Sequence, residues 1–244
     1  MIPGIVAGAR QTSGGGGGGG DPDFANVALL CHFDGTDGST DFVDNSPSPK
    51  TLTAFGNAQL DTEQSKFGGS SGLFDGSGDY VGLADSADFS FGTGDFTIEA
   101  WVRLNSPAGA EGAYVVGQIN SLFTVATGSF FLALNDSSRP AGLMGSGSSL
   151  VVAVATTALS TEQWYHLAFT REANTFRIFV DGILGGSQTS SASMNDSGEA
   201  ISIGRPGAYN GAYFDGWIDD LRITKGVARY TDDFTPPAAA FPNS

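Results

Sequence analysis

The chain has 244 residues, 40% of them hydrophobic, and includes 36 glycines and 10 prolines. Its 26 acidic residues outnumber 11 basic ones, which leaves a formal net charge of −15. A field of this sign repels phosphate backbones and anionic lipids, so neither nucleic acid nor a membrane is an expected partner. No apolar stretch is long enough to span a bilayer, and the first residues lack the basic start of a signal peptide.

The amino end is predicted to be an attachment arm. Residues 14–20 are an unbroken glycine run, which has no side chains to pack and loses much backbone entropy on ordering. We interpret it as a flexible tether, with polyglycine packed around a symmetry axis as the alternative. The apolar residues before it would attach the protein to a larger particle; they are Ile2, Pro3, Ile5 and Val6. The chain therefore divides into an arm, 1–23, and a domain, 24–244.

The domain is predicted to be all-β. Short segments alternate apolar and polar residues with the period of two that is typical of half-buried strands, and glycine-rich turns separate them. The predicted strands are 27–33, 51–55, 72–75, 79–83, 96–104, 113–117, 121–125, 129–134, 140–143, 150–155, 164–171, 175–181, 183–186, 200–203 and 213–224. The single cysteine, Cys31, lies on the apolar face of the first strand and is expected to be a small buried hydrophobe.

Three groups of these segments have characteristic sequences. They are Phe96-Thr-Ile-Glu-Ala-Trp-Val102, the pair Trp164–Thr170 and Phe176–Gly182, and Trp217–Ile223. Together they resemble the laminin G-like domains of the concanavalin A-like lectin/glucanase superfamily. The resemblance implies a jelly-roll β-sandwich of two antiparallel sheets. It specifies a fold more strongly than a function, because one fold hosts many functions.

A calcium site is the most specific chemistry that the resemblance implies. Many members of the superfamily hold a calcium ion where the first and last strands meet, and the matching acids here are Asp34 and Asp220. Asp37, Asp44 and Asp219 are further candidates. Carboxylates and carbonyls of Asp- and Gly-rich loops are suitable calcium ligands. The alternative is that these acids are structural, in turns and ion pairs.

A carbohydrate site is predicted on a loop that carries two tyrosines and an amide, Tyr209, Asn210 and Tyr213. Loops on a rigid scaffold commonly carry binding groups, and lectins of this type stack sugars on aromatic rings. Other aromatic candidates are Trp101, Tyr114 and Trp217. The alternative is that these rings only pack the sheets.

Catalysis is not expected. The paired carboxylates of the glucanase branch, Glu-x-Asp-x-x-Glu on one strand, are missing, and Glu99 is the only acid in its strand. We expect it to pair with Arg103 or with a cross-strand neighbour. The two histidines, His32 and His166, belong to no nucleophile or zinc motif.

These observations favour a non-catalytic virion protein. The ending from Ile218 to Tyr230 is most similar to copies of the domain in tailed-phage structural proteins. The resemblance implies a decoration, fibre or tail-associated protein, made in the host cytoplasm, joined to other virion proteins through its arm, and expected to be a homo-oligomer. Host-surface glycan is a possible ligand. The alternatives are a free or cell-surface bacterial carbohydrate-binding module and a divergent glycosidase.

Overall fold

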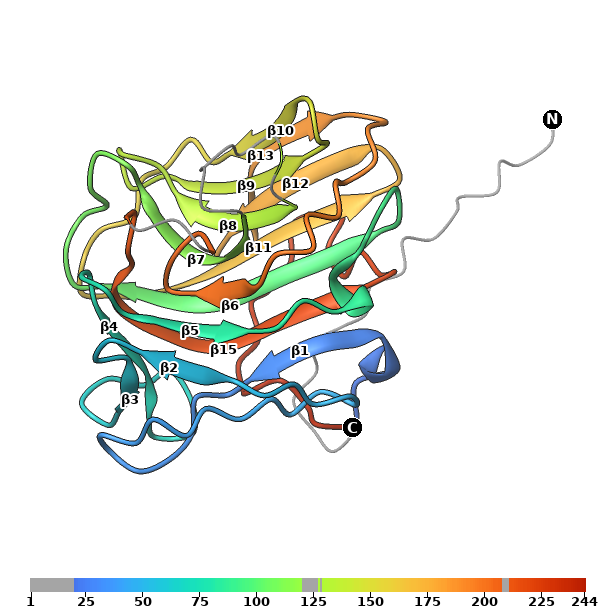
Figure 1. Ribbon diagram of the computed structural model, residues 1–244. Coiled ribbons are helices and arrows are strands. Elements are labelled where there is room, and N and C mark those ends of the chain that lie inside the picture. Colours follow the sequence, from blue (N-terminus) through green and yellow to red (C-terminus); the bar gives the residue numbers. More distant parts are fainter. Residues whose placement is uncertain (1–19, 120–126, 128, 208–210) are drawn as a thin grey trace, which may run out of the picture.

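Two antiparallel sheets pack face to face in the computed structural model, which describes residues 20–119, 127, 129–207 and 211–244 (Figure 1). The larger sheet has eight strands in the order β13-β12-β11-β6-β15-β4-β3, and β1 also pairs with β15. The smaller sheet has seven strands in the order β10-β9-β8-β7-β14-β5-β2. The predicted all-β sandwich of two antiparallel sheets is therefore confirmed.

The strands of the larger sheet are β1 (Val27–Cys31), β3 (Gln59–Asp61), β4 (Ser71–Asp75), β6 (Phe96–Leu104), β11 (Trp164–Glu172), β12 (Thr175–Val180), β13 (Ile183–Thr189) and β15 (Asp215–Lys225). Those of the smaller sheet are β2 (Thr53–Phe55), β5 (Tyr80–Leu83), β7 (Ala113–Gln118), β8 (Phe130–Leu134), β9 (Pro140–Gly145), β10 (Leu150–Val154) and β14 (Ile201–Ile203). Two short 3₁₀ turns, η1 (Phe24–Asn26) and η2 (Ala87–Phe89), complete the described elements.

The sequence pattern predicts most of these strands to within three residues, and 96–104 coincides with β6. It does not predict β3 or the two 3₁₀ turns, which are each three residues long and too short to show a period. The predicted strand 121–125 and the arm residues Ile2, Pro3, Ile5 and Val6 lie outside the described residues. Within the described part of the chain, no helix is long and apolar enough to cross a membrane.

Phenylalanines dominate the core between the sheets. The Phe96 ring packs against Phe91 and Phe169, with centroids 4.8 and 5.2 Å away. Gly142 in β9 faces this cluster, and a Cβ atom there would lie 1.9 Å from Cδ2 of Phe169. A side chain at position 142 would therefore push the sheets apart. Cys31 is buried as predicted, and burial raises the pKa of its thiol well above the ordinary value.

The last segment, which we name the C-terminal strap (residues 226–244), covers the outer face of the larger sheet. Its backbone accepts hydrogen bonds from both central strands. The hydroxyl of Thr97 in β6 donates to the Val227 carbonyl, and the hydroxyl of Thr170 in β11 donates to the Tyr230 carbonyl. Farther along, the amide of Phe241 donates to Asp220. The strap thereby brings the carboxyl end beside β1, where Figure 1 marks the C-terminus.

Beneath the strap lies a buried network centred on Glu99. Its carboxylate accepts hydrogen bonds from Arg222 at 2.8 and 2.9 Å and from the Tyr230 hydroxyl at 2.9 Å, and His166 lies 3.2 Å away. Burial alone would raise the pKa of Glu99, but the charge of Arg222 and the contact with His166 lower it to about 2. The partner is thus the cross-strand neighbour Arg222, not Arg103, because β15 places it opposite Glu99.

Asp21 extends this network to the start of the described chain. Its carboxylate accepts hydrogen bonds from Arg222 at 3.1 Å and from Arg229 at 2.7 and 3.0 Å. Two arginines therefore face two carboxylates in a region where water has little access. The last part of the predicted arm is therefore fixed to the same face of the larger sheet as the C-terminal strap.

Candidate functional site

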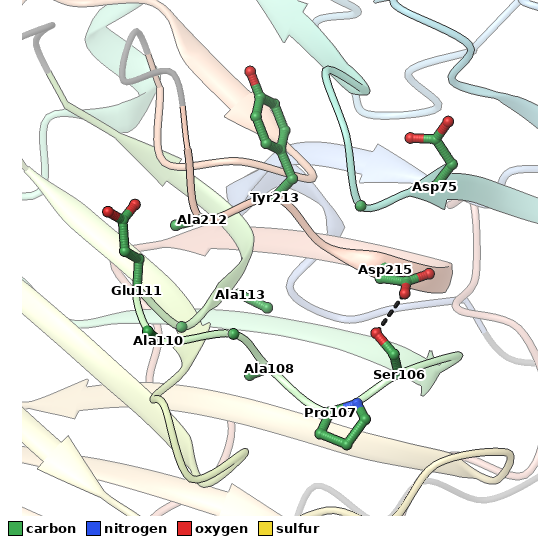
Figure 2. A pocket seen from close by; sticks show the side chains of 13 residues that line it. Asp75, Ser106, Pro107, Ala108, Ala110, Glu111, Ala113, Ala212, Tyr213 and Asp215 are labelled. Carbon is green, nitrogen blue, oxygen red and sulfur yellow. Dashed lines mark hydrogen bonds between the residues drawn. The ribbon is translucent and has the colours of Figure 1, made fainter.

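A pocket of about 390 Å³ opens where three loops meet at one end of the sandwich (Figure 2). One wall is the turn after β4, with Asp75 and Gly76, and another is the β6–β7 connection, 106–112. The third is the approach to β15, with Ala212, Tyr213 and Asp215. Residues distant in sequence meet here because β15 pairs with β4, which sets Asp215 opposite Asp75.

Glycines shape the walls of the pocket. Gly112 has a φ of 80°, and its amide donates a hydrogen bond to the Gly109 carbonyl at 2.9 Å. A Cβ atom at position 112 would lie 2.3 Å from the Leu134 carbonyl oxygen. Gly76 also has a positive φ, 79°, and its amide bonds the carbonyl of Phe214 at 3.1 Å. Glycine adopts these positive-φ conformations without strain, so the two turns are built at positions where glycine stands.

The polar groups of the pocket are mainly acceptors. Asp215 is fixed by the Asn105 side chain, which donates at 3.0 Å, and by the Ser106 hydroxyl. Figure 2 shows Glu111 on one side of the pocket, Asp75 and Asp215 on the other, and Tyr213 between them. Carboxylates accept hydrogen bonds from hydroxyl groups and repel anions, and a tyrosine ring offers a flat apolar face. The pocket therefore suits a hydroxyl-rich ligand that carries no negative charge.

The predicted carbohydrate residues are placed only in part. Tyr213 lines the pocket, whereas Tyr209 and Asn210 lie outside the described residues. Two of the other aromatic candidates are not available, because Trp101 and Tyr114 are buried. Tyr114 packs against Phe131 on the outer face of the smaller sheet, and Trp101 lies against His166. The alternation rule gives the face of a strand, but it does not show what covers that face.

The pocket acids were not among the predicted site residues. Asp75 and Asp215 come from segments that are 140 positions apart, and only the pairing of β4 with β15 brings them together. Glu111 follows three small residues in an irregular loop, where no sequence period marks a functional side chain. The sequence offers one signal for Asp215, which is that it stands two residues after Tyr213, the last residue of the predicted binding loop.

A second polar site lies where β1 and β4 leave a gap along one edge of β15. β4 pairs with β15 as far as Ile218, and β1 pairs from Leu221 onward. Between them the strand bulges, and Asp220 has φ of 48°, a conformation that Asp tolerates better than most residues. Asp219 and Asp220 therefore occupy the gap, next to the end of β1.

The structure shows which groups contact Asp34 and Asp220, the predicted calcium ligands, and two of the further candidates. Asp220 lies 2.6 Å from His32 Nδ1 and accepts the Phe241 amide at 2.8 Å. Asp34 packs directly on Gly68, where a Cβ atom would clash with its carboxylate. Asp37 and Asp44, two of the other candidates, hold loops in place. Asp37 accepts a hydrogen bond from the Thr62 amide, and Asp44 accepts hydrogen bonds from the amides of Leu30, Ser46 and Lys50, all 2.7–3.1 Å long.

Asp219 differs from the other acids. One carboxylate oxygen accepts the amides of Lys66 and Phe67 at 2.7 and 3.0 Å, but the other, Oδ1, is buried and has no hydrogen-bond partner among the described residues. Burial, with the nearby charges of Asp220 and Asp34, raises the pKa of Asp219 to about 7 even though the two amides lower it. Over the described ranges, no three His, Cys, Asp or Glu side chains group closely enough to hold a metal by themselves. Backbone carbonyls or water would have to complete a calcium site.

Solved structures similar to this chain include two toxin binding domains and one domain of an arabinanase. The binding domain of Paraclostridial Mosquitocidal Protein 1 has a TM-score of 0.65 at 14% identity, with 84% of this chain and 50% of that chain covered. Domain 4 of AbnA, a GH43 extracellular arabinanase from Geobacillus stearothermophilus solved with arabinotriose, has a TM-score of 0.62 at 18% identity. The match covers 84% of this chain and 94% of that chain. The botulinum neurotoxin serotype D binding domain has a TM-score of 0.62 at 14% identity, and the match covers 86% of this chain and 51% of that chain.

The TM-scores of 0.62–0.65 show a shared fold, at sequence identities of 14–18%. This chain spans about half the length of the two toxin binding domains and, by coverage, nearly the whole of the AbnA domain. No curated protein sequence matches it. The family model described as concanavalin A-like lectin/glucanases superfamily matches residues 75–229, which include strands of both sheets and all the residues that line the pocket. The chain therefore belongs to the Laminin_G_3 family of the concanavalin A-like lectin/glucanases superfamily.

Proposed function

We propose that the protein is a non-catalytic virion component that binds neutral glycan through the pocket lined by Tyr213. The observation that carries the proposal is the combination of one aromatic ring with three carboxylates in a single pocket. The arabinanase domain of the same fold, solved with arabinotriose, supports a sugar as the ligand. The acidic lining favours uncharged sugars, because it would repel sulfated or uronic acid polymers.

Substitution of Tyr213 tests the glycan proposal. Tyr213→Ala is expected to weaken the Kd for a glycan roughly fivefold, because a stacking contact of about 1 kcal/mol is lost. Tyr213→Phe keeps the ring and should bind nearly as tightly as the native chain. The measurement is calorimetric titration with the strongest neutral ligand from a glycan array. Equal affinity of the Ala variant and the native chain would remove the pocket from the binding site.

Attachment to a virion is proposed for the arm, residues 1–23. The support is the apolar start, the glycine run and the resemblance of 218–230 to phage structural proteins. Deleting residues 1–20 should leave the melting temperature nearly unchanged, since Asp21 and its bonds to Arg222 and Arg229 remain. The same deletion should abolish incorporation into particles, measured by immunoblotting of purified virions. A truncated chain that incorporates normally would favour the alternative of a free carbohydrate-binding module.

Calcium is proposed to bind at the gap between β1 and β4. Its ligands would be Asp34 and Asp220, with Asp219 supplying the buried oxygen that has no partner in the described chain. This oxygen fits a cation, which would offset the repulsion between Asp219 and the charges of Asp220 and Asp34.

Thermal melting tests the calcium site. An ion that binds only the folded state, at 100 times its Kd, adds about 2.7 kcal/mol to the free energy of unfolding. The melting temperature should therefore rise with calcium and fall with chelator, and Asp34→Asn should remove most of this difference. Asp136→Asn, in an exposed turn, is the matched control. Coincident curves of the native chain with calcium and with chelator would eliminate the site.

A further inference from the structure

Three side chains on the outer surface of the smaller sheet form one stacked column. The rings of Phe55 and Tyr80 are parallel within 5°, with centroids 4.4 Å apart. The guanidinium carbon of Arg205 lies 3.3 Å from the centroid of the same Tyr80 ring. One face of a ring has no room for both groups at these distances, so Phe55 and Arg205 occupy opposite faces of Tyr80.

The column ends in an open aromatic face. β2 is the last strand in the order of its sheet, so none of the described strands pairs with it on the side away from β5. Phe55 is 42% exposed, and it reaches across Gly82, where a Cβ atom would lie 3.1 Å from its ring. The glycine thus leaves room for a flat ring. With one face held by Tyr80, the Phe55 ring is oriented before any ligand arrives.

A buried carboxylate links this column to the pocket. Asp79 accepts the amide of Asn57, two residues after Phe55, and the amide of Asp75, which lines the pocket, the latter at 3.0 Å. The Asn57 side chain also lies 3.4 Å from an oxygen of Asp75. Asp79 therefore fixes the β2–β3 turn against the pocket wall. The exposed Asn57 and Asp75 connect the turn that follows Phe55 to the pocket that Tyr213 lines.

We propose that Phe55 stacks a second sugar ring of the same ligand, so that the protein recognises an oligosaccharide rather than a single sugar. This inference rests on the proposed glycan function of the pocket. A sugar ring presents a flat C–H face to the aromatic ring and hydroxyls at its rim, which the amide of Asn57 and the carboxylate of Asp75 can bind. The other large exposed apolar side chains of the described residues belong to other segments: Val43, Leu150, Val154, Ile183 and Leu184.

The experiment compares affinity with glycan length. The probe is an array of neutral mono-, di-, tri- and tetrasaccharides, followed by calorimetric titration of the strongest series. The native chain should bind the longer members at least about tenfold more tightly than the monosaccharide, and Phe55→Ala should remove this gain while leaving monosaccharide binding unchanged. Phe55→Tyr should retain the gain. Ile183→Ala, at a residue 58% exposed on β13, should behave as the native chain does.

Phe55→Leu keeps apolar bulk without a flat ring, and it should show the same loss if Phe55→Ala proves too unstable to purify. An affinity for the tetrasaccharide that is unchanged in both variants, while Tyr213→Ala weakens every member, would overturn the second subsite and leave the pocket as a one-ring site. Failure of the native chain to bind any glycan on the array would overturn the proposed function and this inference together.

Discussion

Replacing Arg222 by methionine is expected to lower the free energy of unfolding by about 3–5 kcal/mol, the cost of breaking a buried ion pair from one side. The substitution keeps side-chain volume but removes the bonds to Glu99 and Asp21, which are both buried. Each carboxylate would then remain in a poorly solvated position with fewer donors. Urea denaturation, followed by tryptophan fluorescence, gives the change.

Arg177→Met is the matched control. Arg177 pairs with Glu172 at 3.2 Å, but Glu172 is largely exposed, and such pairs contribute about 0–1 kcal/mol. A similarly small loss in Arg222→Met would mean that the network under the C-terminal strap is not a main source of stability.

Acid should destabilise the protein through Glu99. Its pKa is about 2 in the folded protein, against an ordinary value of 4.5. Because the folded pKa is the lower one, the stabilisation is complete above pH 4.5 and is lost as the pH falls from 4.5 through 2. Glu99→Gln has no such proton to gain. It should be less stable than the native chain at pH 6, and the difference should narrow toward pH 3.

The measurement is the urea unfolding free energy of both chains at pH 6, 4 and 3. Other carboxylates titrate in both proteins, so only the difference between the chains reports Glu99. A difference that stays constant over this range would show that Glu99 is not held ionised by its neighbours.

The long strands could be predicted from the sequence because their alternation continues over many residues. β6 and the β11–β12 hairpin are examples, with Phe96, Ile98 and Phe176 all facing the core. The same rule placed Glu99 on the outer face correctly, but that face is buried. The C-terminal strap covers it with an irregular segment, which has no period from which its position could be predicted.

The candidate site was less predictable than the fold. Tyr213 was selected for its residue type and its place in a loop, and it does line the pocket. Its acidic neighbours depend on the register between β15 and β4, which the local sequence does not encode. Likewise, Asp219 is distinguished from Asp220 by the bulge and by the two amides donated by Lys66 and Phe67, neither of which the local sequence shows.

The two sites occupy different parts of β15. The pocket lies at its start, beside Asp215, and the acid gap lies at Asp219 and Asp220. A calcium ion at the gap would therefore stiffen the strand that carries one pocket wall without contacting the ligand. This arrangement is consistent with a fixed scaffold that presents loops to a glycan.

A crystal structure of the full chain with the strongest neutral oligosaccharide from the array tests the central claim most directly. We predict density for one sugar ring in the pocket, against Tyr213 and with hydroxyls on Asp75, Glu111 or Asp215. Density for the glycan elsewhere on the sandwich, with the pocket empty at saturating ligand, would contradict the account.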